Sequence, residues 1–112
     1  MSASRGDIWL VDFGEPVGRE QSGRRPAVVV SADPLNASRA GIVIVVPTTT
    51  TPRGLPSHIE IDPATSGLDE VSYAKCEDVK SISEQRLIAR LGAVPDITLF
   101  EIARSLRFLL NL

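Results

Sequence analysis

The alternation of apolar and polar positions predicts six β-strands along the chain. Runs rich in Val and Ile recur at short intervals, and Gly, Pro and Asp separate them, as is typical of short strands joined by turns. The run 42–46 contains only β-branched residues, which predicts a strand buried on both faces. The run 71–76 is expected to bend and continue through residues 79–82. The six predicted strands cover residues 7–13, 27–31, 42–46, 58–61, 71–76 and 88–92.

The last part of the chain predicts one α-helix. Pro95 and Asp96 open it, with Asp96 as the N-cap. Apolar residues then recur at the three- and four-residue spacing of an amphipathic helix. Phe100 and Phe108 lie off the centre of this stripe, so they either cover the rim of the sheet or contact a partner subunit. The stripe consists of Leu99, Ile102, Ala103, Leu106, Leu109 and Leu110.

These elements predict a mainly β fold with a C-terminal α-helix, in the form of a small, strongly bent β-barrel or sandwich. A length of 112 residues is near the commonest domain size, and the sequence contains neither repeats nor a linker. We therefore expect a single domain over residues 1–112. Hydrophobic residues make up 43 % of the chain and only five residues are aromatic, so the core must be mainly aliphatic.

Composition narrows the functional classes. No apolar run approaches the ~20 residues of a membrane span, and the N-terminus lacks a signal peptide, so we expect a cytoplasmic protein without membrane contact. The single cysteine, Cys76, excludes an internal disulfide and is expected in the core. No cluster of His, Cys and Asp has metal-ligand spacing, so we predict neither a metal nor another cofactor.

Charge is unevenly distributed along the chain. The net charge of −2 argues against a generally basic nucleic-acid binder. Residues 1–53, however, hold six basic and five acidic residues, whereas residues 54–112 hold six basic and nine acidic ones. The basic residues of the first half cluster in loops. A local positive groove on such a protein would bind nucleic acid weakly and in a salt-sensitive way.

The loop Gly18-Arg19-Glu20-Gln21-Ser22-Gly23-Arg24-Arg25-Pro26 is the most informative segment, and it runs directly into the predicted strand 27–31. Its two glycines bend the chain, and the strand fixes Arg24 and Arg25 at its end. An arginine held in this way has little rotamer freedom left to lose, so it suits the binding of a phosphate. On this segment alone, a solvated loop remains the alternative.

Several segments together resemble the MazF/PemK family of bacterial toxins, and the resemblance covers nearly the whole chain. Its specific parts are an Arg-Gly-Asp start, a Gly-x-Glu-Gln-x-Gly-x-Arg-Pro loop and a Pro-x-Thr-Thr strand end, each of which would be weak alone. The matching segments are residues 5–12, 18–31, 46–50, 54–56 and 83–87, together with Asn36 and Gly92.

The resemblance implies an SH3-like β-barrel of the CcdB/MazF toxin type, a homodimer, and a sequence-specific endoribonuclease toxin that cleaves single-stranded RNA, with mRNA as the expected target. It further implies metal-independent cleavage that leaves 2′,3′-cyclic phosphate and 5′-hydroxyl ends and inhibits translation and growth. A cognate antitoxin is expected to block the RNA groove with a C-terminal segment that folds on binding.

By the same resemblance, Arg25 and Thr49 are the catalytic arginine and threonine. Arg25 is expected to stabilise charge on the phosphoryl oxygens, because arginine is not deprotonated in proteins. In a regular strand Thr48 and Thr50 would point away from the side that Thr49 faces. Plain β propensity is the other explanation of the threonine run. Glu20 is assigned to the same group, either as a general base or as an ion-pair partner of the adjacent arginines.

The remaining RNA-binding candidates are loop and strand positions. Gln21 is a candidate reader of a base, and the arginines are candidate contacts to the RNA backbone. Arg19, Asp78 and Lys80 depart from the residues usual in the family, which affects the expected RNA sequence rather than the reaction. The full set is Gly18, Arg19, Gln21, Arg24, Arg53, Glu77, Asp78 and Lys80. His58 is interpreted as a surface residue rather than a catalyst.

Three other functions fit the same barrel less well. A CcdB-like toxin that binds DNA gyrase would need a terminal Trp-Gly-Ile, whereas this chain ends in Leu110-Asn111-Leu112. A peptide-binding module would need an aromatic groove, and the chain has few aromatic residues. A non-catalytic relative that only binds a partner is not expected to carry both Arg25 and Thr49.

Overall fold

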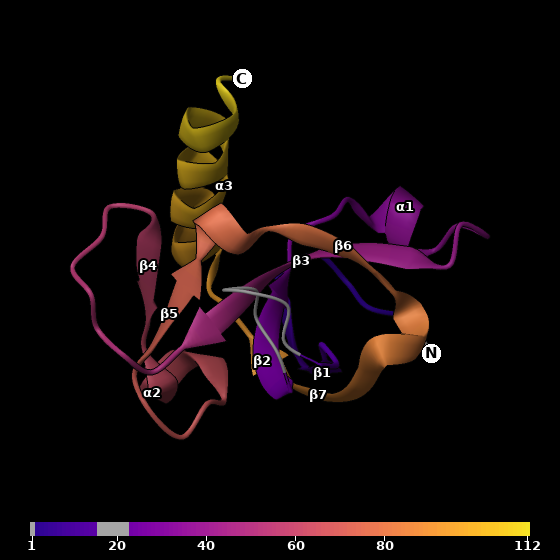
Figure 1. Cartoon of the computed structure of the whole chain (residues 1–112), viewed down its shortest axis with the longest axis horizontal. Coiled ribbons are helices and arrows are strands. Elements are labelled where there is room, and N and C mark those ends of the chain that lie inside the picture. Colours follow the sequence, from indigo (N-terminus) through magenta and orange to yellow (C-terminus); the bar gives the residue numbers. More distant parts are fainter. Residues whose placement is uncertain (1, 16–22) are drawn as a thin grey trace.

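A computed structural model describes residues 2–15 and 23–112 (Figure 1). Within these residues, seven strands form an antiparallel sheet, and the helix α3 stands against one side of it. The mainly β fold with a C-terminal helix is therefore confirmed. In chain order the elements are β1 (Asp7–Asp12), β2 (Arg24–Val29), α1 (Asp33–Asn36), β3 (Ile42–Thr49), β4 (His58–Ile61), α2 (Pro63–Ser66), β5 (Ser72–Lys75), η1 (Cys76–Asp78), β6 (Lys80–Ser83), η2 (Glu84–Arg86), β7 (Leu87–Ala93) and α3 (Asp96–Leu110).

The long strand β3 organises the sheet. The strand order is β4-β5-β3-β2-β1-β7, and β6 pairs with β3 as well. Residues 42–45 of β3 pair with β6, whereas Thr48 and Thr49 pair with β5. The bent strand predicted over residues 71–82 is thus two strands, and the bend is the single 3₁₀ turn η1. This turn lets the two strands pair with successive parts of β3.

Strand β2 begins earlier than its sequence pattern predicts. Its apolar part suggested residues 27–31, but pairing with β1 extends it back to Arg24, which lies opposite Asp12. The two arginines therefore belong to a strand and not to the end of a loop. Polar residues carry no local strand signal, so only the partner strand reveals this extension.

The sheet is bent but, within the described residues, hydrogen bonds do not close it into a barrel, because β4 and β7 remain its end strands. The short helix α2, which the sequence pattern did not predict, packs between these ends against β7. Gly92 permits this contact: a Cβ there would lie 1.8 Å from the carbonyl oxygen of Ser66. Asp62 caps α2 by accepting a hydrogen bond from the N–H of Ala64 at 2.9 Å.

Two apolar clusters lie on opposite faces of the central strands. As predicted for the run 42–46, alternate residues of β3 enter one cluster or the other. The strand cluster contains Ala3, Trp9, Val11, Phe13, Ala27, Val29, Val43, Val45 and Ile82. The helix cluster, which Ile102 of α3 completes, contains Ile8, Val28, Val30, Val46, Ile61, Ala74, Cys76 and Val94. Cys76 is fully buried, which confirms its prediction as a core residue.

Helix α3 begins at Asp96 itself, so the prediction of Asp96 as the N-cap is wrong by one position. Pro95 is the N-cap, and no side chain caps this end. Asp96 instead lies in the first turn, where its negative charge interacts favourably with the helix dipole. Phe100 and Phe108 are 62 % and 85 % exposed, so they do not cover the rim of the sheet. No helix of the described residues is long and apolar enough to cross a membrane.

Candidate functional site

Arg25 and Thr49 lie at adjacent ends of β2 and β3. The last residues that pair between these strands are Ala27 and Pro47, and Arg25 and Thr49 each lie two positions beyond that pair. Since side chains alternate along a strand, both face the same side of the sheet as Ala27, a member of the strand cluster. Arg25 is exposed and Thr49 is partly exposed. A guanidinium and a hydroxyl therefore emerge on one face, where the apolar cluster ends.

The side chains of Thr48 and Thr49 face opposite sides of β3, one toward the core and the other toward solvent. Thr48 is buried, and its hydroxyl donates to the carbonyl of Pro26 at 2.9 Å. Because Pro26 and Pro47 lack an N–H, this hydroxyl links the two strands where the backbone cannot. The Oγ1 of Thr49 instead accepts the N–H of Thr51 at 3.2 Å, which leaves its own hydrogen to be donated outward. The predicted alternation holds for this pair, and of the two only Thr49 keeps a hydroxyl hydrogen for a ligand.

Three of the arginines predicted in the site lie in the described residues, and they do not share one face of the sheet. These are Arg24, Arg25 and Arg53. Arg24 lies opposite Asp12, whereas Arg25 lies opposite Val11, a residue of the strand cluster. Strand alternation therefore directs Arg24 and Arg25 to opposite faces of β2. Arg53 is exposed in the connection between β3 and β4, four positions after Thr49. Only Arg25 shares the face of Thr49 through strand geometry.

Lys80 joins that face from the next strand. It lies opposite Val45 and therefore faces the strand cluster, as Arg25 does. Its ammonium nitrogen is 5.6 Å from the centre of the Phe13 ring, within the range of a cation–π interaction. The apolar ring holds a positive charge at the edge of the cluster. Lys80 is thus a second cation on the side of the sheet from which Thr49 emerges.

Glu77 and Asp78 point back onto their own fold. Glu77 Oε2 lies 2.7 Å from Nε2 of His58, and Oε1 of Glu77 accepts a hydrogen bond from Ser57 at 2.9 Å. Asp78 Oδ2 lies 2.9 Å from Nζ of Lys75, an ion pair without the angles of a hydrogen bond. His58 and Lys75 are themselves paired between β4 and β5. The turn η1 therefore holds these two strands together. We call the contacts of Glu77 with His58 and Ser57, and of Asp78 with Lys75, the clamp.

This clamp changes the interpretation of His58. The side chain of His58 is only 2 % exposed, so its prediction as a surface residue is wrong. The sequence could not show this, because the burial depends on η1 folding over β4. Burial acts to raise the pKa of Glu77, but hydrogen bonds from His58, the backbone and Ser57 outweigh it and hold that pKa below its ordinary value. Glu77 is thus ionised wherever the fold is intact near neutral pH.

Four of the predicted site residues, Gly18, Arg19, Glu20 and Gln21, lie outside the described residues. Within the described part of the chain, no three His, Cys, Asp or Glu side chains come together as a group that could hold a metal ion. Burial, as the largest of several influences, raises the pKa of the Cys76 thiol, so this residue stays protonated at neutral pH.

Sequence reasoning missed two residues of β5, Tyr73 and Lys75. Tyr73 lies directly opposite Thr49 on one side and Glu60 on the other, so the three side chains share a face. Lys75 follows on that face two positions later. The alternation of Ser72 and Ala74, which are buried, with Tyr73 and Lys75, which are partly exposed, was the available signal. The register against Thr49 had no local signal.

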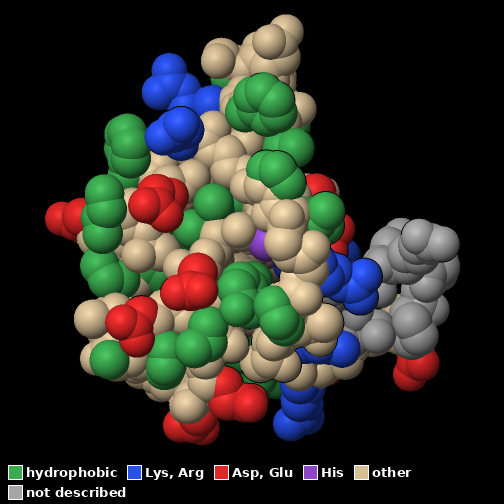
Figure 2. Space-filling view, turned by 90° about the vertical axis from the view of Figure 1, so that its left-hand side faces the viewer, with side chains coloured by type: hydrophobic (Ala, Val, Ile, Leu, Met, Phe, Trp, Pro, Cys, Tyr) green, Lys and Arg blue, Asp and Glu red, His purple; other side chains and the backbone are tan. Residues whose placement is uncertain are grey.

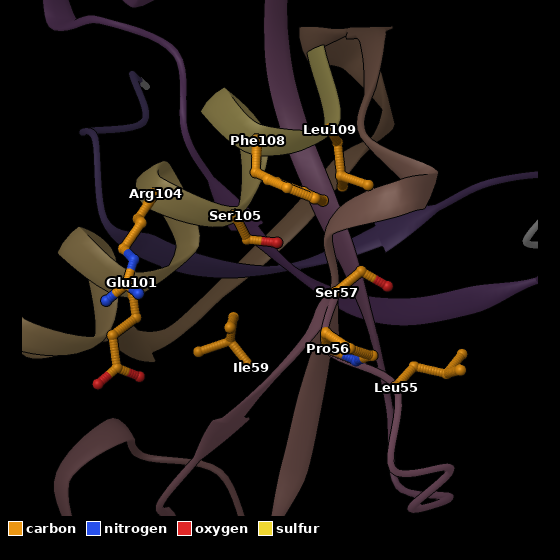
Figure 3. A pocket seen from close by; sticks show the side chains of 9 residues that line it. All are labelled: Leu55, Pro56, Ser57, Ile59, Glu101, Arg104, Ser105, Phe108 and Leu109. Carbon is orange, nitrogen blue, oxygen red and sulfur yellow. The ribbon is translucent and has the colours of Figure 1, made fainter. Parts of the chain in front are cut away.

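A second surface of different character lies beside α3. A hollow of about 620 Å³ separates the helix from the segment Leu55–Ile59. Figure 3 shows Phe108 and Leu109 reaching from the helix toward Leu55 and Pro56 across this hollow. The space-filling view of this side shows apolar side chains over much of the face, with Lys and Arg in separate groups at its margins (Figure 2). Arg104 and Glu101 nevertheless line the hollow beside its apolar residues.

Comparison with known proteins gives consistent matches over the full length. The family model for PemK-like, MazF-like toxins of type II toxin–antitoxin systems matches residues 4–110. The endoribonuclease MazF9 of Mycobacterium tuberculosis is 34 % identical over 113 residues, which cover 96 % of both chains.

Solved structures agree with this match. A crystal structure of MazF from Deinococcus radiodurans has a TM-score of 0.86 and 25 % identity, covering 100 % of this chain and 99 % of that one. A mycobacterial endoribonuclease in complex with its cognate antitoxin has a TM-score of 0.83 and 25 % identity, covering 99 % of this chain and 97 % of that one.

Proposed function

This chain belongs to the PemK-like, MazF-like toxins of type II toxin–antitoxin systems, and on that premise we propose that it is an endoribonuclease toxin. It cleaves single-stranded RNA, mRNA foremost, at a short sequence, without a metal ion, and thereby stops translation and growth. It does so as one domain over residues 1–112, in the cytoplasm. The observation that supports this proposal best is the shared face of Arg25 and Thr49 at the adjacent ends of β2 and β3.

RNA carries its own nucleophile in the 2′-hydroxyl next to the phosphate to be cleaved. The 2′-oxygen loses its proton and bonds to phosphorus, the bond from phosphorus to the 5′-oxygen breaks, and that oxygen takes up a proton. The products are a 2′,3′-cyclic phosphate and a 5′-hydroxyl. The enzyme must stabilise the charge that develops on the phosphoryl oxygens and guide the two protons.

Arg25 and Thr49 match the electrostatic part of this task. The planar guanidinium of Arg25 binds two phosphoryl oxygens at once, and it keeps its charge throughout the reaction. Thr49 donates its hydroxyl hydrogen to a phosphoryl oxygen while the N–H of Thr51 holds its oxygen in place. Glu20 remains proposed either as the base that removes the 2′-proton or as an anchor of Arg25.

RNA binding extends outward from this pair. Lys80 adds positive charge on the same side of the sheet, held by the ring of Phe13. The other proposed contacts are Gly18, Arg19, Gln21, Arg24 and Arg53. Glu77 and Asp78 stay in the proposal as determinants of the RNA sequence, but their carboxylates are already engaged with His58 and Lys75, so they act chiefly by shaping the surface.

Two protein partners complete the proposal. The chain forms a homodimer, supported by the exposed apolar side chains that α3 carries, among them Phe100 and Phe108. A cognate antitoxin inhibits the toxin by laying a C-terminal segment into the RNA groove. The structural similarity to an endoribonuclease in complex with its cognate antitoxin supports this assignment.

The test is cleavage of a long single-stranded RNA by the purified protein in excess EDTA, with the ends of the products mapped. The wild-type protein is expected to give discrete cuts with cyclic phosphate ends. Arg25→Ala is expected to reduce the rate by about 100-fold or more, as loss of one charge-stabilising donor does in other enzymes. Arg39→Ala is the matched control, because Arg39 is exposed in the turn between α1 and β3 and lies on none of the strands that carry the described site residues.

Three results of this experiment would each contradict a different part of the proposal. Intact RNA with the wild-type protein would contradict the endoribonuclease proposal and favour a toxin that only binds its target. Cuts that disappear with EDTA would contradict the metal-independent mechanism. Equal activity in Arg25→Ala and Arg39→Ala would remove Arg25 from the catalytic group while leaving the enzyme assignment intact.

A further inference from the structure

We propose that Tyr73 of β5 stacks on the base of the nucleotide that adjoins the cleaved phosphodiester. This inference rests on the proposed function and adds a substrate contact to it. Neither the arginine loop nor the threonine run supplies such a group. Tyr73 becomes part of the site only through the pairing of β5 with the end of β3.

The register places Tyr73 next to the reacting group. Tyr73 and Thr49 are directly opposed in the antiparallel pair of β3 and β5. Directly opposed residues project from the same face, with Cβ atoms about 5 Å apart. Arg25 emerges on that face from the other side of β3. Thr49 and Tyr73 are therefore one strand spacing apart, about 4.8 Å, so a nucleotide whose phosphate contacts Thr49 has the tyrosine within reach of its base.

Tyr73 is the aromatic residue that the sheet offers to a ligand. Trp9 and Phe13 are 2 % and 7 % exposed inside the strand cluster, and Phe100 and Phe108 lie on α3. Tyr73 is partly exposed on β5, among polar and charged neighbours. Recognition of single-stranded RNA relies on aromatic side chains that stack on unpaired bases. A tyrosine in this position matches that requirement.

The strand that carries Tyr73 fixes the backbone of this residue. Its neighbours in sequence, Ser72 and Ala74, are buried on the opposite face. On both sides the backbone of β5 is paired, with β3 and with β4. Because the backbone is already fixed before RNA binds, only the side-chain torsions of Tyr73 remain to be ordered on binding.

Charge around the ring favours RNA phosphates on the β3 side of Tyr73, where Arg25 emerges, over the β4 side. Lys75 lies two positions beyond Tyr73 on the same face, and its ion pair with Asp78 fixes its direction. The only acidic side chain paired directly with Tyr73 across the described strands is Glu60, on the far side from Thr49. Phosphates are thus attracted on the side of the ring nearest the reacting group and repelled on the other.

The test measures binding of a short RNA that contains the cleavage sequence but carries a 2′-O-methyl group at the cleaved nucleotide, so that it cannot react. The same RNA is made with a single abasic nucleotide at each position around the cut. Wild-type protein is compared with Tyr73→Phe, which keeps the ring, and Tyr73→Leu, which keeps apolar volume but removes the ring. Melting temperatures establish that each variant is folded.

We expect Tyr73→Leu to weaken binding by about 5- to 160-fold, the range that corresponds to loss of one stacked base, and Tyr73→Phe to bind within about twofold of wild type. An abasic nucleotide next to the cut should weaken binding to the wild-type protein and to Tyr73→Phe, but have little further effect on Tyr73→Leu. An equal abasic effect in all three proteins would overturn the stacking proposal while cleavage by the wild type still supported the nuclease.

Two further results are decisive as well. If the wild-type protein neither cleaves the unmodified RNA nor binds the modified one, the proposed function fails and this inference fails with it. If Tyr73→Leu does not fold, the wild-type protein decides alone, because insensitivity to an abasic nucleotide on either side of the cut would contradict stacking there.

Discussion

The end of the sheet around Thr49 and the outer face of α3 present exposed side chains in two different ways. Arg25, Thr49 and Tyr73 are polar or half-polar groups mounted on strands whose other faces are buried. Helix α3 is anchored through the fully buried Ile102, yet Phe108 on its outer side is 85 % exposed. The first surface is stable in water as it stands, whereas the second gains free energy when another surface covers it.

This difference separates chemistry from assembly. The site needs fixed positions, and the paired strands provide them without any partner. The helix face and the hollow between α3 and the segment Leu55–Ile59 need no fixed chemistry, but they expose the apolar area that a protein interface uses. Substitutions in one region should therefore leave the function of the other region unchanged. The following experiments test this separation, beginning with the largest expected effect.

The surface formed by Arg25, Thr49 and Tyr73 is called the polar region below, and the exposed face of α3 the apolar region. Two adjacent threonines, Thr48 and Thr49, provide the sharpest test of the polar region. Thr49→Val removes the donor that faces the phosphate, and we expect cleavage to slow by about 100-fold or more with an unchanged melting temperature. Thr48→Val removes the hydroxyl bonded to Pro26, and we expect a loss of about 1 kcal/mol in the free energy of unfolding with near-normal cleavage. Single-turnover rates and thermal melts measure both quantities. The reverse pattern would mean that the two threonines have been assigned the wrong roles.

Phe108 provides the corresponding test of the apolar region. Phe108→Ser is expected to weaken the proposed homodimer by about 30-fold or more, since a central aromatic residue often carries that share of an interface. It should barely alter the stability of the monomer, because the side chain is 85 % exposed. Analytical ultracentrifugation over a range of concentrations measures the dissociation constant. Val71→Ser, at a 43 % exposed residue outside α3, is the control. Equal dimer strength in both variants would place the interface elsewhere.

The sequence predicted the parts of the molecule that local patterns encode. Runs of β-branched residues located the strands, and the three- and four-residue spacing located α3. Alternation separated Thr48 from Thr49 before their contacts were known. The helix α2 also had a local signal, Asp62 followed by Pro63, which is a common start of a helix and was missed.

The features that the sequence did not predict depend on contacts between segments that are distant along the chain. The extension of β2 to Arg24 depends on β1, and the meeting of Tyr73 with Thr49 depends on which strands pair and in what register. The burial of His58 depends on η1, whose acidic residues were expected to contact RNA and not to fold back onto β4. The proposed catalytic residues, Arg25 and Thr49, were inferred from the resemblance to a family, whereas the position of Tyr73 opposite Thr49 required the fold.

A smaller effect tests the cations on the polar region. Lys80→Met keeps the length of the side chain and its packing on Phe13 but removes the charge. If Lys80 contacts a phosphate, the slope of log K against log salt for single-stranded RNA should become shallower by about 0.7. Arg39→Met is the control, and its slope should equal that of the wild type. An unchanged slope in Lys80→Met would confine Lys80 to a structural role.

The smallest expected effect concerns the clamp between β4 and β5. The pKa of Glu77 is held below its ordinary value in the fold, so its ionised form stabilises the native state. That contribution is complete above the pKa of the unfolded chain, near 4.5, and is lost as the pH falls through the lower folded value. Glu77→Gln should therefore reduce the melting temperature slightly at pH 7 and flatten its decline below pH 4.5. Glu101→Gln, at an exposed residue of α3, should keep the decline of the wild type.

The clamp also fixes the strand that carries Tyr73. A slower cleavage rate in Glu77→Gln at pH 7, with an unchanged dimer, would therefore show that the polar region depends on this support and the apolar region does not.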